Sequence, residues 1–200
     1  MRMGTYQEVV RRLQPIIGPL HTSLQQGISY AETLHGPEGF DRKIDLHFWA
    51  HTARRRAADL LREAGLNAEV EGQVSRLSAI LVQYNNVWLR VLRPEIHKGR
   101  VRVPVPGRSA TRQAFYRQDP VLEDLEGPAA DNILLLWQDE AGMLREPMTL
   151  VRPTGGDHLR RNLTLDWMGD MELRMASLRA ADLDALQPRV MYRQIGSDSA

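Results

Sequence analysis

The histidines His47 and His51 have the spacing best suited to metal chemistry. They stand four positions apart in a segment with helical periodicity, so both imidazoles lie on one side of a helix and could grip one metal ion. The helical zinc motif HExxH has glutamate after its first histidine, whereas Phe48 follows His47 here, and Asp45 points to another side of the helix. We therefore predict that the pair binds no metal.

The same helical segment predicts a secondary basic face. Its members fall within one arc of a helical wheel and are His47, His51, Arg54, Arg55 and Arg62. We expect this face to be solvated. A basic helical face is also suited to contact with nucleic acid or with an acidic protein.

The densest positive charge lies between residues 88 and 118, which carry eight basic and one acidic side chain. Residues 119–187 carry six basic and fourteen acidic side chains, although the whole chain has a net charge of only +1. We predict a nucleic-acid-binding or anion-binding edge formed by Arg90, Lys98, Arg100, Arg102, Arg108, Ser109, Arg112 and Arg117.

Ser109 is expected to cap a short helix through about Gln118, whose first N–H groups would attract an anion. Two alternatives stay open: a merely solvated basic edge, or a basic edge neutralised by the acidic half of the chain. Phe115 and Tyr116 on this helix are either stacking partners for a ligand or core residues.

Carboxylates in the acidic half could hold magnesium or relay protons if they were paired in space. The candidates are Asp139, Glu140, Asp166 and Asp170. The first two are expected in a hairpin turn, and Asp166 alternates with apolar neighbours on an exposed strand face, so we predict surface positions. The chain has neither a G-x-S-x-G elbow nor a Walker loop, and we assign no catalytic residue and no cofactor.

Composition excludes several classes of protein. The chain has no cysteine, so disulfides, thiolate zinc sites and cysteine nucleophiles are ruled out, and a reducing compartment is indicated. No apolar run approaches the roughly 20 residues that span a bilayer, and the first residues lack a signal-peptide core. We expect a cytoplasmic protein that does not enter membranes.

Apolar periodicity places helices first and strands afterwards. Residues 9–34 carry an amphipathic stripe interrupted by Pro15 and Pro19, which predicts two helices or one kinked helix. A further helix is expected over residues 42–64, with Gly65 as its C-terminal cap.

Alternating patterns from Asn67 onward predict strands, with a hairpin turn at Asn85-Asn86 and a last helix over residues 177–186. The class is therefore α+β, with N-terminal helices packed on a mainly antiparallel sheet of about five to seven strands. We divide the chain into a helical segment over residues 1–36, an α+β domain over residues 37–196 and a disordered tail over residues 197–200. The first segment is a candidate dimerisation element, because its stripe offers more apolar surface than two helices need to cover.

Two resemblances extend this interpretation. A long helix followed by Gly65, a strand and a hairpin resembles the opening of PD-(D/E)xK nucleases, which implies a nuclease-like fold. Residues 76–80 and 87–93, where that family has its acids, contain no carboxylate, so the implied site lacks its catalytic groups. From Leu46 to Trp167 the chain has a helix with His-x3-His, a hairpin, the motif Pro-Gly-Arg-Ser-x2-Arg-x2-Phe-Tyr-x-Gln and then Ile-Leu-Leu-Leu-Trp. This order of motifs resembles small uncharacterised proteins of actinobacterial chromosomes, phages and plasmids, which implies an accessory or regulatory role in a mobile element.

The sequence thus favours a non-enzymatic binding or regulatory protein whose basic edge meets nucleic acid or an acidic protein. One alternative is a divalent-metal hydrolase or nuclease that uses His47 and His51 with carboxylates of the sheet. Another is a homo-oligomeric assembly protein held by its first helices.

Overall fold

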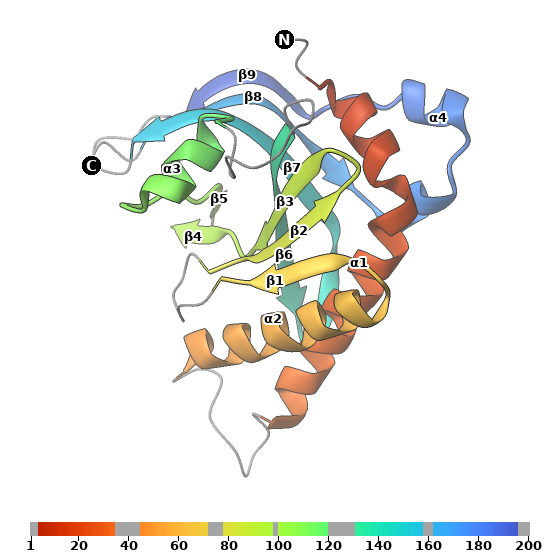
Figure 1. The fold of residues 1–200 in the computed structure, drawn as a ribbon, viewed down its shortest axis with the longest axis vertical. Coiled ribbons are helices and arrows are strands. Elements are labelled where there is room, and N and C mark those ends of the chain that lie inside the picture. Colours follow the sequence, from red (N-terminus) through yellow and green to blue (C-terminus); the bar gives the residue numbers. More distant parts are fainter. Residues whose placement is uncertain are drawn as a thin grey trace.

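The computed structural model describes residues 4–34, 45–71, 78–97, 100–119, 131–157 and 162–195. Within these ranges the elements are α1 (Tyr6–Leu34), α2 (Leu46–Glu63), β1 (Asn67–Val70), β2 (Ile80–Tyr84), β3 (Val87–Leu92), β4 (Glu95–His97), β5 (Arg100–Arg102), α3 (Ala110–Tyr116), β6 (Asp131–Glu140), β7 (Met143–Asp157), β8 (Asn162–Met171), the 3-10 helix η1 (Leu173–Ser177), α4 (Ala180–Asp184) and β9 (Val190–Ile195). Two long helices precede the strands, which confirms the predicted α+β class (Figure 1).

Seven of the described strands form one sheet in the order β1-β2-β3-β6-β7-β8-β9, and β4 and β5 form a separate two-stranded ribbon. Neighbouring strands in the sheet are antiparallel except β3 and β6, which are parallel. A parallel pair needs a crossover connection, and here the crossover contains the ribbon and α3. The sheet is therefore mainly antiparallel, as predicted.

Helix α1 is a single helix, although it contains Pro15 and Pro19. Each proline removes one N–H donor from the helical ladder. Pro15 is exposed, whereas the side chains of Leu13, Ile17 and Leu20 are fully buried. Packing of this apolar face outweighs the two lost hydrogen bonds, so of the two expected alternatives the structure has one helix rather than two.

The apolar stripe of α1 is covered within the chain itself. Leu13, Leu20 and Ile28 have no exposed surface, and Leu24 has 2%, whereas Leu34 at the end of the helix is 45% exposed. Helix α2 crosses α1 closely (Figure 1). At the crossing, a Cβ atom on Gly27 would collide with the backbone oxygen of Ala53, so glycine permits the close approach. The excess apolar surface that suggested a dimer is therefore mostly absent.

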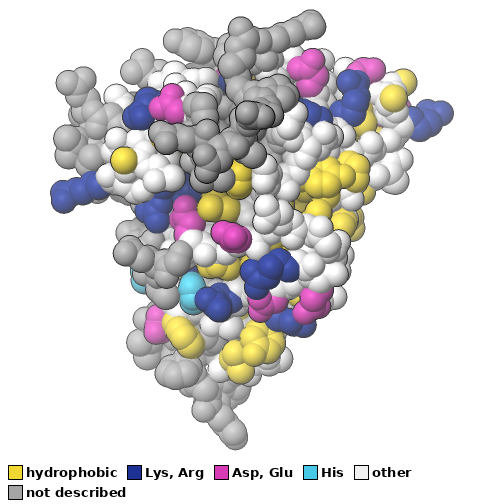
Figure 2. All heavy atoms as spheres, viewed as in Figure 1, with side chains coloured by type: hydrophobic (Ala, Val, Ile, Leu, Met, Phe, Trp, Pro, Cys, Tyr) yellow, Lys and Arg dark blue, Asp and Glu magenta, His cyan; other side chains and the backbone are white. Residues whose placement is uncertain are grey.

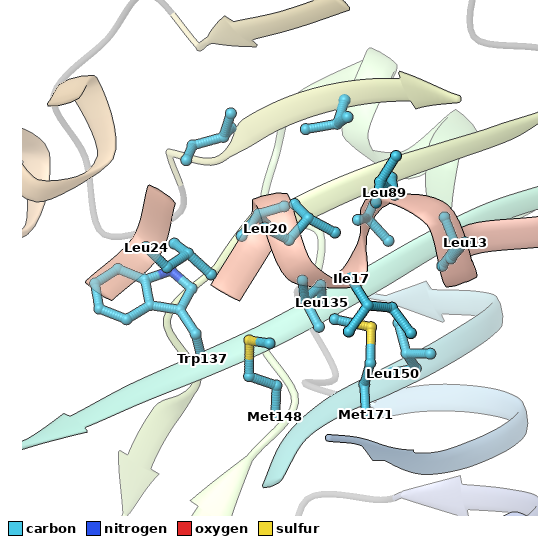
Figure 3. Close-up of a cluster of buried hydrophobic side chains, with 14 of the residues drawn as sticks. Leu13, Ile17, Leu20, Leu24, Leu89, Leu135, Trp137, Met148, Leu150 and Met171 are labelled. Carbon is cyan, nitrogen blue, oxygen red and sulfur yellow. The ribbon is translucent and has the colours of Figure 1, made fainter. Parts of the chain in front are cut away.

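The core lies on both faces of the sheet. On one face, side chains of α1 such as Leu13, Ile17 and Leu24 meet Leu135 and Trp137 of β6 (Figure 3). A smaller cluster on the other face joins α3 to the alternate residues of the same strands, including Leu134 and Leu136. The central strands β3 and β6 are thus buried on both sides.

Most local signals in the sequence are found where they were expected. Gly65 follows α2 with a φ of 81°, as predicted. The start of this helix was expected at residue 42, whereas α2 begins at Leu46, where Asp45 caps it by accepting a hydrogen bond from Phe48 N at 3.0 Å. Asn85 and Asn86 have φ values of 46° and 57° and connect β2 to β3. In the part of the chain that the structure describes, no helix is both long and apolar enough to cross a bilayer.

Candidate anion-binding pocket

The guanidinium of Arg54 is buried, and none of the described residues pairs with it as a counter-ion. Arg54 is 2% exposed and lies on α2 in the row formed by Ala50, Ala57 and Leu61, which faces the core. Among the contacts of the described residues it has no carboxylate partner, and its Nε atom has no hydrogen-bond acceptor. The prediction that Arg54 belongs to a solvated face was wrong, because small alanines on this row bring α2 close to the rest of the core.

This environment disfavours the charged form of Arg54. Burial away from water lowers its pKa from 12.5 to about 10, and repulsion from Arg93 adds to the effect, while Glu71 opposes it. A difference of that size corresponds to a penalty on the order of 3 kcal/mol at neutral pH. Among the described residues, Glu71 offsets this penalty only in part, and Arg54 forms no ion pair with it.

Arg54 opens into a pocket of about 220 Å³ between the start of α2 and the segment that enters β4. The wall consists of Leu46, His47, Ala50, Arg54, Arg93, Pro94, Glu95 and Ile96. It combines two guanidinium groups and one carboxylate with an apolar rim, since Leu46 is 45% and Ile96 is 65% exposed.

Arg93 is the second guanidinium of the pocket and is held firmly in place. Its Nη2 donates to Asp139 Oδ1 at 3.0 Å, and the Asp139 side chain is fully buried. The guanidinium carbon also lies 5.1 Å from the ring centroid of Trp49 and 5.5 Å from that of Trp137. The surface position predicted for Asp139 was therefore wrong, because the carboxylate neutralises an arginine inside the protein.

Several arginines of the predicted basic edge are neutralised by carboxylates, and Glu71 neutralises two of them. Arg90 Nη2 donates to Glu71 Oε1 at 2.7 Å and to Oε2 at 2.9 Å, and Arg112 Nη2 donates to Oε2 at 3.3 Å. Arg90 is 2% exposed and lies over the ring of Phe115 at 5.6 Å. The assignment of Arg90 to an accessible binding edge was wrong, because β3 is a central strand covered on both faces.

The remaining members of the basic edge are spread over the surface. Arg102 is half-buried, Arg108 is exposed, and Arg117 pairs with Asp119 at 3.0 Å. Arg100 contributes to β5, and Lys98 lies outside the described residues.

The helix that follows this edge is capped as predicted, and its aromatic residues belong to the core. Ser109 Oγ accepts a hydrogen bond from Arg112 N at 3.4 Å. Phe115 and Tyr116 are 2% and 1% exposed, and the Tyr116 hydroxyl donates to Pro104 O at 2.6 Å. Burial raises the pKa of Tyr116 far above its usual value of 10. Of the two interpretations that the sequence left open for this aromatic pair, the structure supports core residues.

The secondary basic face of α2 is divided between two pockets. His47 lines the pocket of Arg54, whereas His51 and Arg55 line a separate pocket of about 470 Å³ with Tyr30 and Leu34. Burial and the nearby cations Arg54 and Arg55 lower the pKa of His51 below 6.5.

Arg62 on the same face is engaged within the chain. It pairs with Asp59 and donates to Ala68 O at 3.0 Å. Over the residues that the structure describes, no three His, Asp or Glu side chains come together as metal ligands.

The other candidate acids have arginine partners or are exposed. Asp166 accepts from Arg152 at 3.3 Å, Asp170 lies 2.8 Å from Arg189, and Glu140 is exposed. On the face shown in Figure 2, several basic and acidic side chains of the described residues lie beside one another.

Comparison with known proteins adds no relative. A scan against protein-family models finds no match, and searches of curated proteins and of solved structures find none either. The resemblances noted from the sequence therefore stay predictions.

Sequence reasoning missed Arg93, Glu95 and Ile96 as parts of the pocket. A signal for Arg54 was present, since it stands in the row of Ala50, Ala57 and Leu61 rather than opposite to it. Arg93 and Glu95 flank Pro94 just after a central strand, and their place beside α2 depends on tertiary packing alone.

Proposed function

We propose that this protein is a non-enzymatic, regulatory binding protein that holds an acidic group of its partner in the pocket around Arg54. The observation that carries the proposal is a buried guanidinium that lines a pocket and forms no ion pair with any of the described residues. Such a cation destabilises the fold, and a bound anion would remove the penalty. We expect the protein to act in the cytoplasm, in keeping with the lack of cysteine.

This proposal relocates the binding site predicted from charge density. Arg90, Arg112 and Arg117 already have carboxylate partners in the described structure, so they offer less to an outside anion. A site spread along that edge would have to break existing ion pairs. The metal-dependent hydrolase has less support, because His47 and His51 line different pockets.

Thermal unfolding in acetate and in phosphate at constant ionic strength tests the proposal. At least one of these anions should raise the melting temperature of the wild type, because a ligand that binds only the folded state stabilises it. Arg54→Met should abolish that increase. Arg55→Met is the matched control, since Arg55 is the exposed neighbour on the same helix, and it should respond as the wild type does.

A short DNA duplex tests the site first predicted from the sequence. If the double variant Arg108→Ala and Arg112→Ala loses salt-dependent DNA affinity and Arg54→Met keeps it, the binding face is the basic edge and the proposal is wrong. If neither anion stabilises the wild type through Arg54, the proposal is wrong as well.

A further inference from the structure

We propose that the pocket of Arg54 recognises a single carboxylate carried on an apolar stem, rather than a phosphate group. This inference rests on the proposed function and names the ligand class of the same site. Three properties of the pocket support it: its charge, its rim and its size.

The charge of the pocket suits one negative charge. Arg93 is paired with the buried carboxylate of Asp139 at 3.0 Å, whereas Arg54 has no ion pair among the described residues. The carboxylate of Glu95 also lines the pocket and repels any anion there, a dianion about twice as strongly as a monoanion. A carboxylate carries one charge at neutral pH and matches the planar guanidinium with two parallel hydrogen bonds. A carboxylate therefore meets less repulsion from Glu95 than a phosphate dianion does.

The rim of the pocket suits an apolar stem. Leu46 and Ile96 stand at the entrance with 45% and 65% of their surfaces exposed, and Ala50 and Pro94 add apolar wall. A group that follows the carboxylate out of the pocket would cover these side chains and remove their apolar surface from water.

The size of the pocket limits what can enter it. A volume of about 220 Å³ lies below the roughly 300–1,000 Å³ of pockets that enclose drug-sized ligands. A glutamate side chain or a short carboxylic acid is small enough, whereas a whole nucleotide is not. The carboxylate can come from a free acid or from a peptide, and the experiment separates these two sources.

Hexanoate is the first probe, with hexanamide and inorganic phosphate as comparisons at constant ionic strength. We expect saturable binding of hexanoate in heteronuclear NMR titrations, with shifts confined to the start of α2 and to residues 93–96. Hexanamide has the same stem without charge and should not bind. Arg54→Met should weaken hexanoate binding by at least about tenfold, because hydrogen bonds to a charged group are lost. Arg55→Met should leave it unchanged.

Two rim variants test the stem and the charge separately, and both change partly exposed residues. Ile96→Ser should weaken hexanoate by roughly threefold to tenfold and leave acetate unaffected, because only the longer acid reaches the rim. Glu95→Gln should strengthen hexanoate and allow phosphate to bind, because the repelling carboxylate is removed.

Peptides identify the source of the carboxylate. An acetylated and amidated peptide with one glutamate between two leucines is compared with its glutamine counterpart. If the glutamate peptide binds at least about tenfold more tightly than hexanoate, the source is a protein partner; if not, it is a free acid.

The outcomes distinguish the two levels of the argument. If phosphate binds through Arg54 and hexanoate does not, the carboxylate inference is wrong while the proposed function stands. If neither probe depends on Arg54, both are wrong.

Discussion

Arg54 and Arg90 are buried to the same extent, at 2% exposure each, yet their surroundings differ completely. Arg90 meets both oxygens of Glu71 and the ring of Phe115, so its charge is balanced inside the fold. Arg54 lines a pocket and has no such partner among the described residues. The comparison teaches that burial alone does not tell a structural arginine from a functional one. The source of the counter-ion separates the two cases: Arg90 has a counter-ion inside the fold, and we propose that Arg54 receives its counter-ion from a ligand.

Removal of the Glu71 carboxylate, the counter-ion of Arg90, should change the free energy of unfolding more than any other substitution of these arginines or their partners. Glu71→Gln would remove the carboxylate that pairs with the buried Arg90, and it would weaken the contact with Arg112. We expect a loss of about 3–5 kcal/mol in the free energy of unfolding, measured by urea denaturation. Glu63→Gln is the control, because the pair of Glu63 with Arg56 is exposed and should matter little. Equal losses in the two variants would contradict the contrast.

Removal of the unbalanced cation should act in the opposite direction. Arg54→Met keeps most of the side-chain volume and eliminates a buried charge, so we expect a gain of about 1–3 kcal/mol in the absence of ligand. The same denaturation experiment measures it, and Arg55→Met should change stability by less than about 0.5 kcal/mol. A loss of stability in Arg54→Met would show that its guanidinium has a partner within the fold.

The basic edge should respond weakly to neutralisation. For the double variant Arg108→Ala and Arg112→Ala we expect a loss of less than about 1 kcal/mol, because Arg108 is exposed and Glu71 keeps its contact with Arg90. A fall of several kcal/mol in the free energy of unfolding would mean that the ion pairs of the basic edge are needed to stabilise the fold. The basic edge would then be a structural feature rather than a surface that tolerates the loss of its charges.

The smallest expected effect concerns pH. Because the pKa of His51 is lowered in the folded state, the folded protein binds fewer protons at this group than the unfolded chain does. Its contribution to stability is present above about pH 6.5 and is lost as the pH falls through the lower folded-state pKa. His51→Gln should therefore show a shallower loss of unfolding free energy between about pH 7 and about pH 5. Identical slopes for the variant and the wild type would refute this.

Most of the fold could be predicted because local signals control it. The positive φ at Gly65 and the turn at Asn85-Asn86 each follow from one or two residues. The parallel pairing of β3 with β6 and the edge strand β9 were missed, because strand order is decided by long-range packing rather than by local pattern.

The site was harder to predict than the fold. Helical spacing correctly placed His47, His51 and Arg54 on one helix, but it could not say which side of the helix the neighbouring segment would cover. Charge density along the chain pointed to Arg90 and Arg112, and it could not show that Glu71, about twenty and forty residues earlier, supplies their counter-ion. Electrostatic balance is a property of three-dimensional neighbours, so a one-dimensional count of charges cannot tell a neutralised arginine from an available one.

The packing of α1 has a consequence for how the chain is made. Helix α2 emerges from the ribosome soon after α1. Much of the apolar face of α1, however, is covered by Leu135, Met148 and Met171, which lie more than a hundred residues later in the chain (Figure 3). A ribosome that adds about 5–20 residues per second reaches them only after roughly ten seconds. During that interval part of the apolar face of the nascent α1 is exposed to solvent, and we expect chaperones that bind emerging chains to recognise it. Synthesis rate and chaperone supply should thus govern the yield of this protein in cells.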